Sequence, residues 1–213
     1  MRYTIKEDTL IVNGEFEALS SGINGGRKGV TTLFNHTINP DLFNHAPPER
    51  YTERVADKHG ILPPYFGLLT AVKMEYLQII RDEYLTAFIT AGITNPSPFR
   101  IRGQEITHTQ SREEITETIG TINIILVADA TLSEEAMASA IITATEAKGL
   151  ALLKAGCNFL GTTTDAIIIA YEKNPTRRIK YAGTCTEFGE KITEAIIRGV
   201  KKPRNVNCTP HHQ

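Results

Sequence analysis

The feature that most constrains the fold is one continuous block between residues 121 and 171. It begins with the apolar run TINIILV, continues through a long alanine-rich segment after Ser133, and ends with the apolar run AIIIA. Short runs of Ile, Val and Leu are typical of strands buried on both faces. The middle segment has apolar and alanine residues at helical spacing, Ser133 before it as an N-cap and Gly156 after it. The block therefore predicts a strand, a helix and a second strand.

The flanking segments extend this pattern. A stripe of apolar residues predicts a last helix over about residues 188–200, which Pro203 would end. β-Branched and aromatic residues predict short strands towards the N-terminus, and prolines mark the starts of shorter helices. These strands are expected at 3–6, 10–12, 16–20, 30–34 and 84–90, and these helices at 48–57 and 66–74. The predicted fold class is α/β in layers, with a mixed sheet packed against helices and a β-α-β-α order in the C-terminal half.

Composition indicates one domain and excludes several classes of partner. The 213 residues are 41% hydrophobic, so we expect a single domain over 1–201 and a flexible tail over 202–213. The 23 basic and 24 acidic residues give a net charge of −1 without a basic patch, which does not support nucleic-acid binding. No basic amphipathic stretch or signal peptide stands out, and no apolar run approaches the roughly 20 residues that span a bilayer. The three cysteines form no close-spaced pair, so we expect a cytoplasmic protein.

The first candidate site is the glycine-rich loop SSGINGG at residues 20–26. Its glycines, Gly25 and Gly26 among them, permit close backbone approach to a ligand, and Ser21 adds a hydroxyl. Consecutive N–H groups could form an anion-binding nest. The spacing matches neither a P-loop nor a dinucleotide fingerprint. An ordinary glycine-rich connection is the alternative.

The second candidate is FNHT, which directly follows a predicted strand. His36 could act as a general base, because imidazole is easily tuned to titrate near neutral pH. Asn35 could orient a substrate amide or donate to an oxyanion. The alternative is a structural histidine that only makes hydrogen bonds at the end of a strand.

The third candidate is the loop GTTTD at residues 161–165. Thr162, Thr163 and Thr164 offer hydroxyls and backbone donors, and Asp165 adds a carboxylate at a loop end where layered α/β folds collect ligands. The alternative is that Asp165 caps a turn and the threonines favour extended backbone.

Further candidates lie on or near the two long helices. In GTCTE, Thr184 precedes the last helix, whose free N–H groups could hold an anion, although an N-cap at Thr186 is the simpler reading. Glu146 lies among small residues, where a buried carboxylate would need a partner, but a solvated surface charge is the alternative.

The C-terminal tail offers the potential ligands Cys208, His211 and His212. It follows Pro203 in a polar terminus, where a disordered end is the better interpretation, and no metal is expected.

Several of these segments resemble one known family. GTINIILVADATLSEEAMASAIITATEAKGLALLKAG followed by GTTTDAIIIAY is similar to the core of the adenosylcobinamide amidohydrolase (CbiZ) family. ALSSGINGG, FNHTI, GLLTAV, TAGITNPSPF and YAGTCTEFGEKITEAI resemble its other motifs in the same order. The resemblance covers roughly residues 18–200.

The resemblance implies an enzyme that hydrolyses the amide between a corrin propionate and 1-aminopropan-2-ol. A corrinoid, adenosylcobinamide, would be the small-molecule substrate, adenosylcobyric acid the product, and no cofactor would be required. The mechanism we infer is attack by a water activated by His36 or Asp165, with a threonine nucleophile as the competing route. The remaining candidates would bind the oxyanion or the substrate: Thr163, Thr164 and Thr184 the oxyanion, Asn35 and Asn95 the amide or corrin side chains, and Gly25 and Gly26 the macrocycle.

Two other functions stay open at this point: a corrinoid-binding protein without catalysis, and hydrolysis of an unrelated amide on the same scaffold. The apolar strands are also compatible with a homo-oligomer. All of these mechanisms require that the loops around 20–36, 95, 161–165 and 184 converge on one pocket.

Overall fold

The computed structural model of the chain describes residues 1–39, 47–93, 96–97, 99–102, 104–105, 120–173 and 176–200. Its main element is an eight-stranded mixed sheet in the order β4-β3-β2-β11-β9-β6-β5, with β1 paired to β2. These strands are β1 (Arg2–Lys6), β2 (Thr9–Ser20), β3 (Gly26–Thr37), β4 (Tyr65–Thr70), β5 (Gln78–Arg81), β6 (Leu85–Ala91), β9 (Ile122–Ala128) and β11 (Ala166–Glu172). The helices are α2 (Pro48–Lys58), α3 (Glu134–Lys154), α4 (Glu187–Gly199) and the short 3₁₀ turn η1 (Met74–Tyr76). Two small pairs complete it: β7 (Arg100–Ile101) with β8 (Gln104–Glu105), and β10 (Thr131–Leu132) with β12 (Arg178–Ile179).

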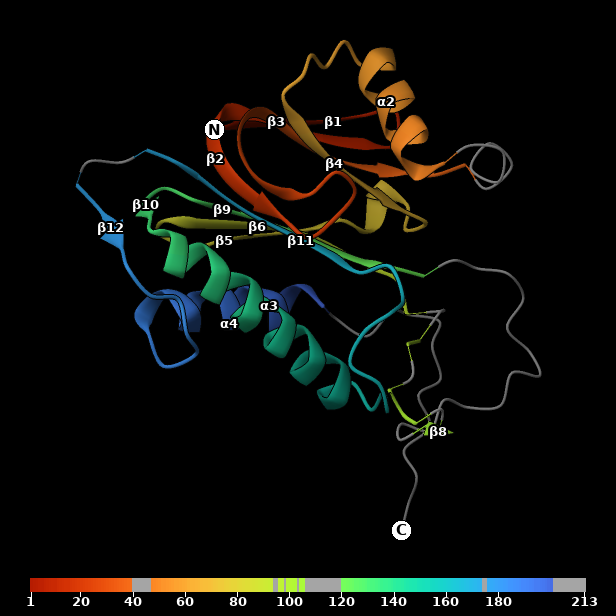
Figure 1. Cartoon of the computed structure of the whole chain (residues 1–213), viewed down its shortest axis with the longest axis vertical. Coiled ribbons are helices and arrows are strands. Elements are labelled where there is room, and N and C mark those ends of the chain that lie inside the picture. Colours follow the sequence, from red (N-terminus) through yellow and green to blue (C-terminus); the bar gives the residue numbers. More distant parts are fainter. Residues whose placement is uncertain are drawn as a thin grey trace.

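The long sheet folds over itself at a bulge in β2. The register between β2 and β3 shifts between Asn13 and Phe16. Before this point β2 pairs with β1, and after it β2 pairs with β11. A bulge bends and twists the strand that carries it. The first half of β2, the second half of β3, and β1 and β4 therefore lie over β11, β9, β6 and β5, as Figure 1 shows.

The result is four layers with three hydrophobic cores between them (Figure 1). The first core lies between α3, α4 and the lower half of the sheet, and contains Ile124, Met137 and Ile192. The second lies between the two halves of the sheet, with Leu10, Phe66, Phe88 and Ile125. The third lies between the upper half and α2, with Phe34, Tyr51 and Val55. Side chains of one strand alternate between two cores because successive residues point to opposite faces.

The strand, helix and strand predicted from residues 121–171 are confirmed. All seven residues of β9 are buried, since helices cover one face and the folded-over strands cover the other. Ser133 caps α3 by accepting a hydrogen bond from the N–H of Ala136, and Gly156 follows the helix at φ 84°. Buried alanines such as Ala140 and Ala144 let α3 lie close to the sheet. The mixed α/β class is confirmed as well.

Two sequence predictions are wrong. Residues 66–74 were expected to form a helix, but 65–70 form strand β4, which pairs in parallel with β3. Phe66 and Leu68 face the middle core while Gly67 faces α2, and a strand is the element that separates neighbours in this way. The separate strands at 10–12 and 16–20 are one bent strand, β2. Strand β5 was not predicted.

Helix α3 also corrects the expectation that no segment is long and apolar enough to span a bilayer. Among the described residues it is one helix that meets this test by length and composition, but 56% of its apolar window is buried inside the fold. A core helix rich in alanine passes the same test, and the packing of α3 against the sheet accounts for its composition.

Candidate functional site

A buried amide network lies at one end of the core between the two sheet halves. Nδ2 of Asn35 donates to Oγ1 of Thr90 at 2.9 Å. Nδ2 of Asn123 donates to Oδ1 of Asn35 at 2.9 Å and to the backbone oxygen of Leu69 at 2.8 Å. Oδ1 of Asn123 is buried and has no hydrogen-bond partner among the described residues. The network thus joins β3, β4, β6 and β9 and leaves one acceptor unused.

The glycine-rich loop closes this end of the core. A Cβ on Gly22 would lie 2.6 Å from Cδ2 of Leu68 and 3.3 Å from Cβ of Ala166. In the sheet, Leu68 pairs with Asn35 and Ala166 pairs with Asn123, so the loop sits beside the amide network. A Cβ on Gly25 would lie 2.4 Å from the backbone oxygen of Ser20, a space that only glycine fits.

Ser21 ties the glycine loop to β11. Its N–H donates to the backbone oxygen of Ile167 at 3.0 Å, and its Oγ accepts from the N–H of Ile167 at 3.0 Å. The hydroxyl is therefore engaged in continuing the sheet, while the backbone of Gly25 and Gly26 is exposed.

A second polar cluster surrounds Asp165, between β11 and α3. One carboxylate oxygen, Oδ2, accepts from Lys148 Nζ at 2.5 Å and from the N–H of Thr162 at 2.9 Å. The other, Oδ1, accepts from Oγ1 of Thr162 at 2.5 Å and from the N–H of Ile122 at 2.7 Å. Both charged side chains are 8% exposed. A carboxylate has about four lone-pair sites, and here four donors occupy them.

The threonines of the 161–165 loop divide into buried and exposed members. Thr162 is buried by its bonds to Asp165. Thr163 and Thr164 are exposed at the mouth of β11, and Oγ1 of Thr164 donates to Oγ1 of Thr121 at 3.1 Å. The loop therefore presents two hydroxyl-bearing residues to solvent above the buried ion pair.

A third cluster surrounds His36, between β3 and α2. Oγ1 of Thr9 lies 2.7 Å from Nδ1 of His36 and 2.9 Å from Nε2 of His59. Burial, which disfavours the charged imidazolium, together with the nearby His59 and Lys58, lowers the pKa of His36 to about 4. Burial also lowers the pKa of His59.

These three clusters lie along one edge of the molecule, each in a different core. His36 follows Asn35 on β3 and faces the opposite side of the strand. Asn35 bonds to Asn123, which follows Ile122, and the N–H of Ile122 bonds to Asp165. We call this column the polar edge: His36, Asn35, Thr90, Asn123, Asp165 and Lys148. It is continuous from α2 to α3 across all four layers.

Two expected site residues lie away from the polar edge. Thr184 is exposed next to the start of α4, where Glu187 accepts a hydrogen bond from Tyr84 at 2.8 Å. Tyr84 precedes β6 and Thr90 lies near its end, so roughly 20 Å of strand separates the two regions. Glu146 is exposed on α3, in agreement with the surface-charge alternative.

Asn95 and the tail residues Cys208, His211 and His212 lie outside the described residues. Within the described ranges, no group of three or more His, Cys, Asp or Glu side chains could hold a metal ion.

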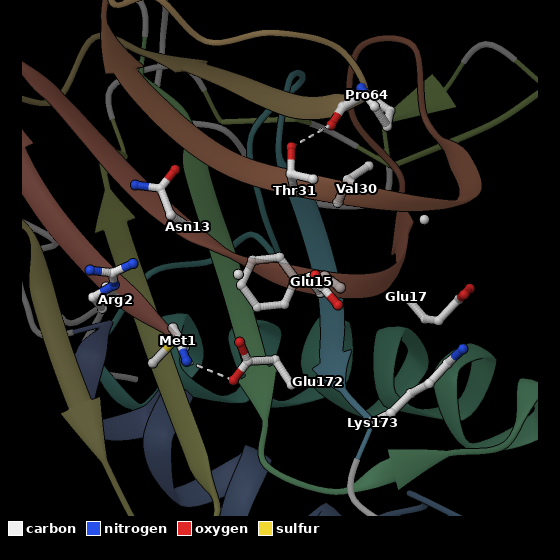
Figure 2. A pocket seen from close by; sticks show the side chains of 13 residues that line it. Met1, Arg2, Asn13, Glu15, Glu17, Val30, Thr31, Pro64, Glu172 and Lys173 are labelled. Carbon is white, nitrogen blue, oxygen red and sulfur yellow. Dashed lines mark hydrogen bonds and ion pairs between the residues drawn. The ribbon is translucent and has the colours of Figure 1, made fainter.

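A cavity of about 720 Å³ lies elsewhere, at the bend of the sheet. Figure 2 shows its charged rim, where the amine of Met1 contacts Glu172 at 2.6 Å and Glu15 and Glu17 lie nearby. None of the site residues expected from the sequence lines it. Glu172 ends β11 whereas Asp165 precedes it, so the cavity and the polar edge are at opposite ends of that strand. We place the candidate site at the polar edge, where the buried polar groups concentrate.

Sequence reasoning missed three residues of the polar edge: Thr90, Asn123 and Lys148. Asn123 is a single amide within an apolar run, and a polar residue in a strand buried on both faces was the signal that could have identified it. Lys148 falls on the apolar stripe of α3, where a cation needs a buried partner. Its pairing with Asp165, 17 residues later, follows only from the tertiary structure.

Comparison with known proteins identifies the family of this chain. The family model for adenosylcobinamide amidohydrolase matches residues 2–207. A protein of that name from Methanosarcina mazei is 54% identical over 94% of this chain and 96% of its own length. Another protein of that name, from Halobacterium salinarum, is 29% identical over 84% of this chain and 76% of its own length. An uncharacterized protein from Methanocaldococcus jannaschii is 30% identical over 90% of this chain and 84% of its own length. No solved structure matches. The chain belongs to the adenosylcobinamide amidohydrolase (CbiZ) family and is a hydrolase acting on amide bonds.

Proposed function

We propose that this enzyme hydrolyses adenosylcobinamide to adenosylcobyric acid and 1-aminopropan-2-ol. The observation that carries the proposal is the 54% identity, over nearly the whole of both chains, to a relative named adenosylcobinamide amidohydrolase. The bond cut would be the amide that links the corrin propionate to the amino alcohol. We also propose that the enzyme is cytoplasmic and needs no cofactor.

The polar edge supports this proposal because the segments that resemble the family's motifs lie in it or next to it. The glycine loop, the end of β3, the end of β4, the end of β6 and the starts of β9 and β11 all contribute to it. These are the segments in which SSGINGG, FNHTI, GLLTAV, TAGITN, INIILVADA and GTTTD occur. A corrin macrocycle is large enough to contact several of these segments at once, and the exposed Gly25 and Gly26 backbone offers it a flat surface.

His36 is the residue that we propose as general base. If the hydroxyl of Thr9 donates to the backbone oxygen of Glu7, 3.2 Å away, its lone pairs can accept from Nδ1–H of His36 and Nε2–H of His59. That tautomer leaves Nε2 of His36 as an acceptor for a proton from water. At pH 7 the lowered pKa keeps the imidazole in the neutral form that a general base needs, and it also makes this base weaker than an exposed histidine.

Asp165 is better suited to position the 161–165 loop than to accept a proton, because donors already occupy its lone pairs. Its bonds to Thr162 fix the loop that carries Thr163 and Thr164. We propose that hydroxyl and N–H groups of these exposed threonines bind the corrinoid. The oxyanion role predicted from the sequence would require them to reach the amide beside His36, from which the Asn35–Asn123 network separates them. Water would be the nucleophile, without a covalent intermediate.

Incubation of the purified chain with adenosylcobinamide tests the function. We expect chromatography to detect adenosylcobyric acid and free 1-aminopropan-2-ol. The variant His36→Ala should lose turnover by about a hundredfold or more while still binding the corrinoid. Glu146→Gln, on the exposed face of α3, is the control and should keep turnover. A corrinoid spectral shift with no amine released over hours would instead support a binding protein without catalysis.

A further inference from the structure

Oδ1 of Asn123 is a buried hydrogen-bond acceptor for which the described part of the fold supplies no donor. The side chain is 1% exposed, and no residue that the structure describes donates a hydrogen bond to its Oδ1. A buried acceptor without a partner costs free energy, so native proteins rarely keep one without water, a ligand or a task. An apolar residue such as the neighbouring Ile125 would have filled this space between the sheet halves at no such cost.

The orientation of this amide is fixed by its partners. Both N–H bonds of Nδ2 are used, one by Oδ1 of Asn35 and one by the backbone oxygen of Leu69. Rotating the amide by 180° would place Oδ1 against these two acceptors, and this arrangement is unfavourable. The unpaired atom is therefore the carbonyl oxygen, and it can only accept a hydrogen bond.

The cover over this end of the core is thin. Gly22 contributes no side chain, and its backbone rests directly on Leu68 and Ala166, which flank Asn35 and Asn123 in the sheet. The same loop exposes Asn24, Gly25 and Gly26 to solvent. An N–H group that reached Asn123 beneath this loop would meet an acceptor that is already oriented and already desolvated.

We propose that Oδ1 of Asn123 accepts an N–H from one of the carboxamide side chains at the periphery of the corrin, and so acts as a specificity residue. This inference rests on the proposed function, because it assumes a corrinoid substrate. Asn123 and His36 face different cores on either side of β3, so the amide held by Asn123 is a different one from the amide that is cut. A site that accepts an amide N–H rejects a carboxylate at the same position, because two acceptors repel.

Steady-state kinetics of Asn123→Leu tests the proposal, with adenosylcobinamide as substrate and adenosylcobyric acid as competing product. Both corrinoids keep the peripheral carboxamides, so we expect KM and the product Ki to rise together, by about tenfold to a hundredfold, with kcat nearly unchanged. The matched control is Thr143→Val, which removes another buried hydrogen bond, from Thr143 to the backbone oxygen of Ala182, outside the polar edge. It should leave KM and Ki within about twofold of the wild type.

Three outcomes would overturn the proposal. Unchanged KM and Ki would mean that water or nothing satisfies the oxygen. A rise in KM alone would place Asn123 at the scissile amide, and a fall in kcat alone would make it part of the packing around the catalytic groups. If Asn123→Leu fails to fold, Asn123→Val, which is smaller, suits a strand and also lacks the acceptor, is judged by the same criteria. Wild-type turnover is measured in the same assay, so loss of the proposed function itself would be seen separately.

Discussion

His36 is a buried histidine whose ionisation should affect folding as well as catalysis. Its pKa is lowered to about 4, mainly by burial, whereas an unfolded histidine has a pKa of about 6.5. Between these values the unfolded chain binds more protons than the folded chain, so the free energy of unfolding falls as the pH falls. His59, whose pKa is also lowered, contributes in the same direction.

We therefore expect the free energy of unfolding to decrease by up to about 3 kcal/mol between pH 6.5 and pH 4 because of His36. Urea denaturation at a series of pH values measures it. The variant His36→Gln should flatten this part of the pH profile, and His59→Gln should flatten it less, since His59 is more exposed. Equal slopes in the wild type and in His36→Gln would show that His36 is not the titrating group.

Lys148 and Asp165 form a buried ion pair, in which each charge compensates the other. Removing one partner leaves an uncompensated charge, so Lys148→Met should cost about 3–5 kcal/mol of stability. The double variant Lys148→Met/Asp165→Asn should recover a large part of that loss. A double-mutant cycle by denaturation measures the coupling, and a coupling energy below about 0.5 kcal/mol would contradict the prediction. Turnover should stay low in Lys148→Met, in Asp165→Asn and in the double variant if the pair positions the 161–165 loop.

The sequence could predict a site residue where the signal lies in neighbouring residues, but not where it depends on a partner far away in the sequence. Asn35 and Asp165 stand next to predicted strands, and that position was enough to select them. Lys148 and Asn123 have polar side chains at positions that periodicity assigns to the core, and periodicity gives no information about their partners. Asn123 meets Asn35, which is 88 residues earlier in the sequence, only because the bend in β2 folds one half of the sheet over the other.

Strand β4 contains a glycine that packs closely against β3 and α2. A Cβ on Gly67 would lie 2.2 Å from Cζ of Phe34 and 2.7 Å from Cγ2 of Thr52 on α2. Gly67→Ala should therefore destabilise the protein by about 1–3 kcal/mol, through overpacking in the core beneath α2. Gly183→Ala is the matched control: a Cβ there would meet nothing within 4 Å, and we expect a change within about 0.5 kcal/mol. Thermal denaturation checks both, and equal midpoints would contradict the packing argument.

Helices that begin at a capping residue could be predicted from the sequence. Strands whose form depends on which strand they pair with could not. Helices α3 and α4 have N-caps at Ser133 and Thr186 that the sequence identified, and both caps accept the expected backbone N–H. The GLLTAV segment has apolar residues that fit a short helix or a strand equally well. Only its parallel pairing with β3 and its position between two cores decide for a strand. The bulge at Asn13–Phe16 likewise made one strand read as two.

At the scale of the whole molecule, the layered fold separates two surfaces that could bind a ligand. The polar edge collects buried polar groups from all three cores, whereas the cavity at the bend is lined by Asn13, Glu15, Glu17, Glu172 and their neighbours. Seven residues of β11, roughly 20 Å, separate them. The cavity alone would favour the bend as the substrate site. Among the described residues, however, the unpaired buried acceptor that could bind an amide N–H is Oδ1 of Asn123, at the polar edge.

Hydrogen exchange followed by mass spectrometry decides between these surfaces. Saturation with adenosylcobyric acid should slow amide exchange in residues 20–26 and 161–165, because a corrin lying on these loops restricts their opening. Peptides covering 13–17 and 29–31 should exchange at an unchanged rate and serve as the internal control. Slower exchange in 13–17 and 29–31 alone would instead place the corrinoid at the bend, and the polar edge would then have only a structural role. Protection at both ends would require a ligand that spans β11, which a single corrin that lies flat on the glycine loop does not do.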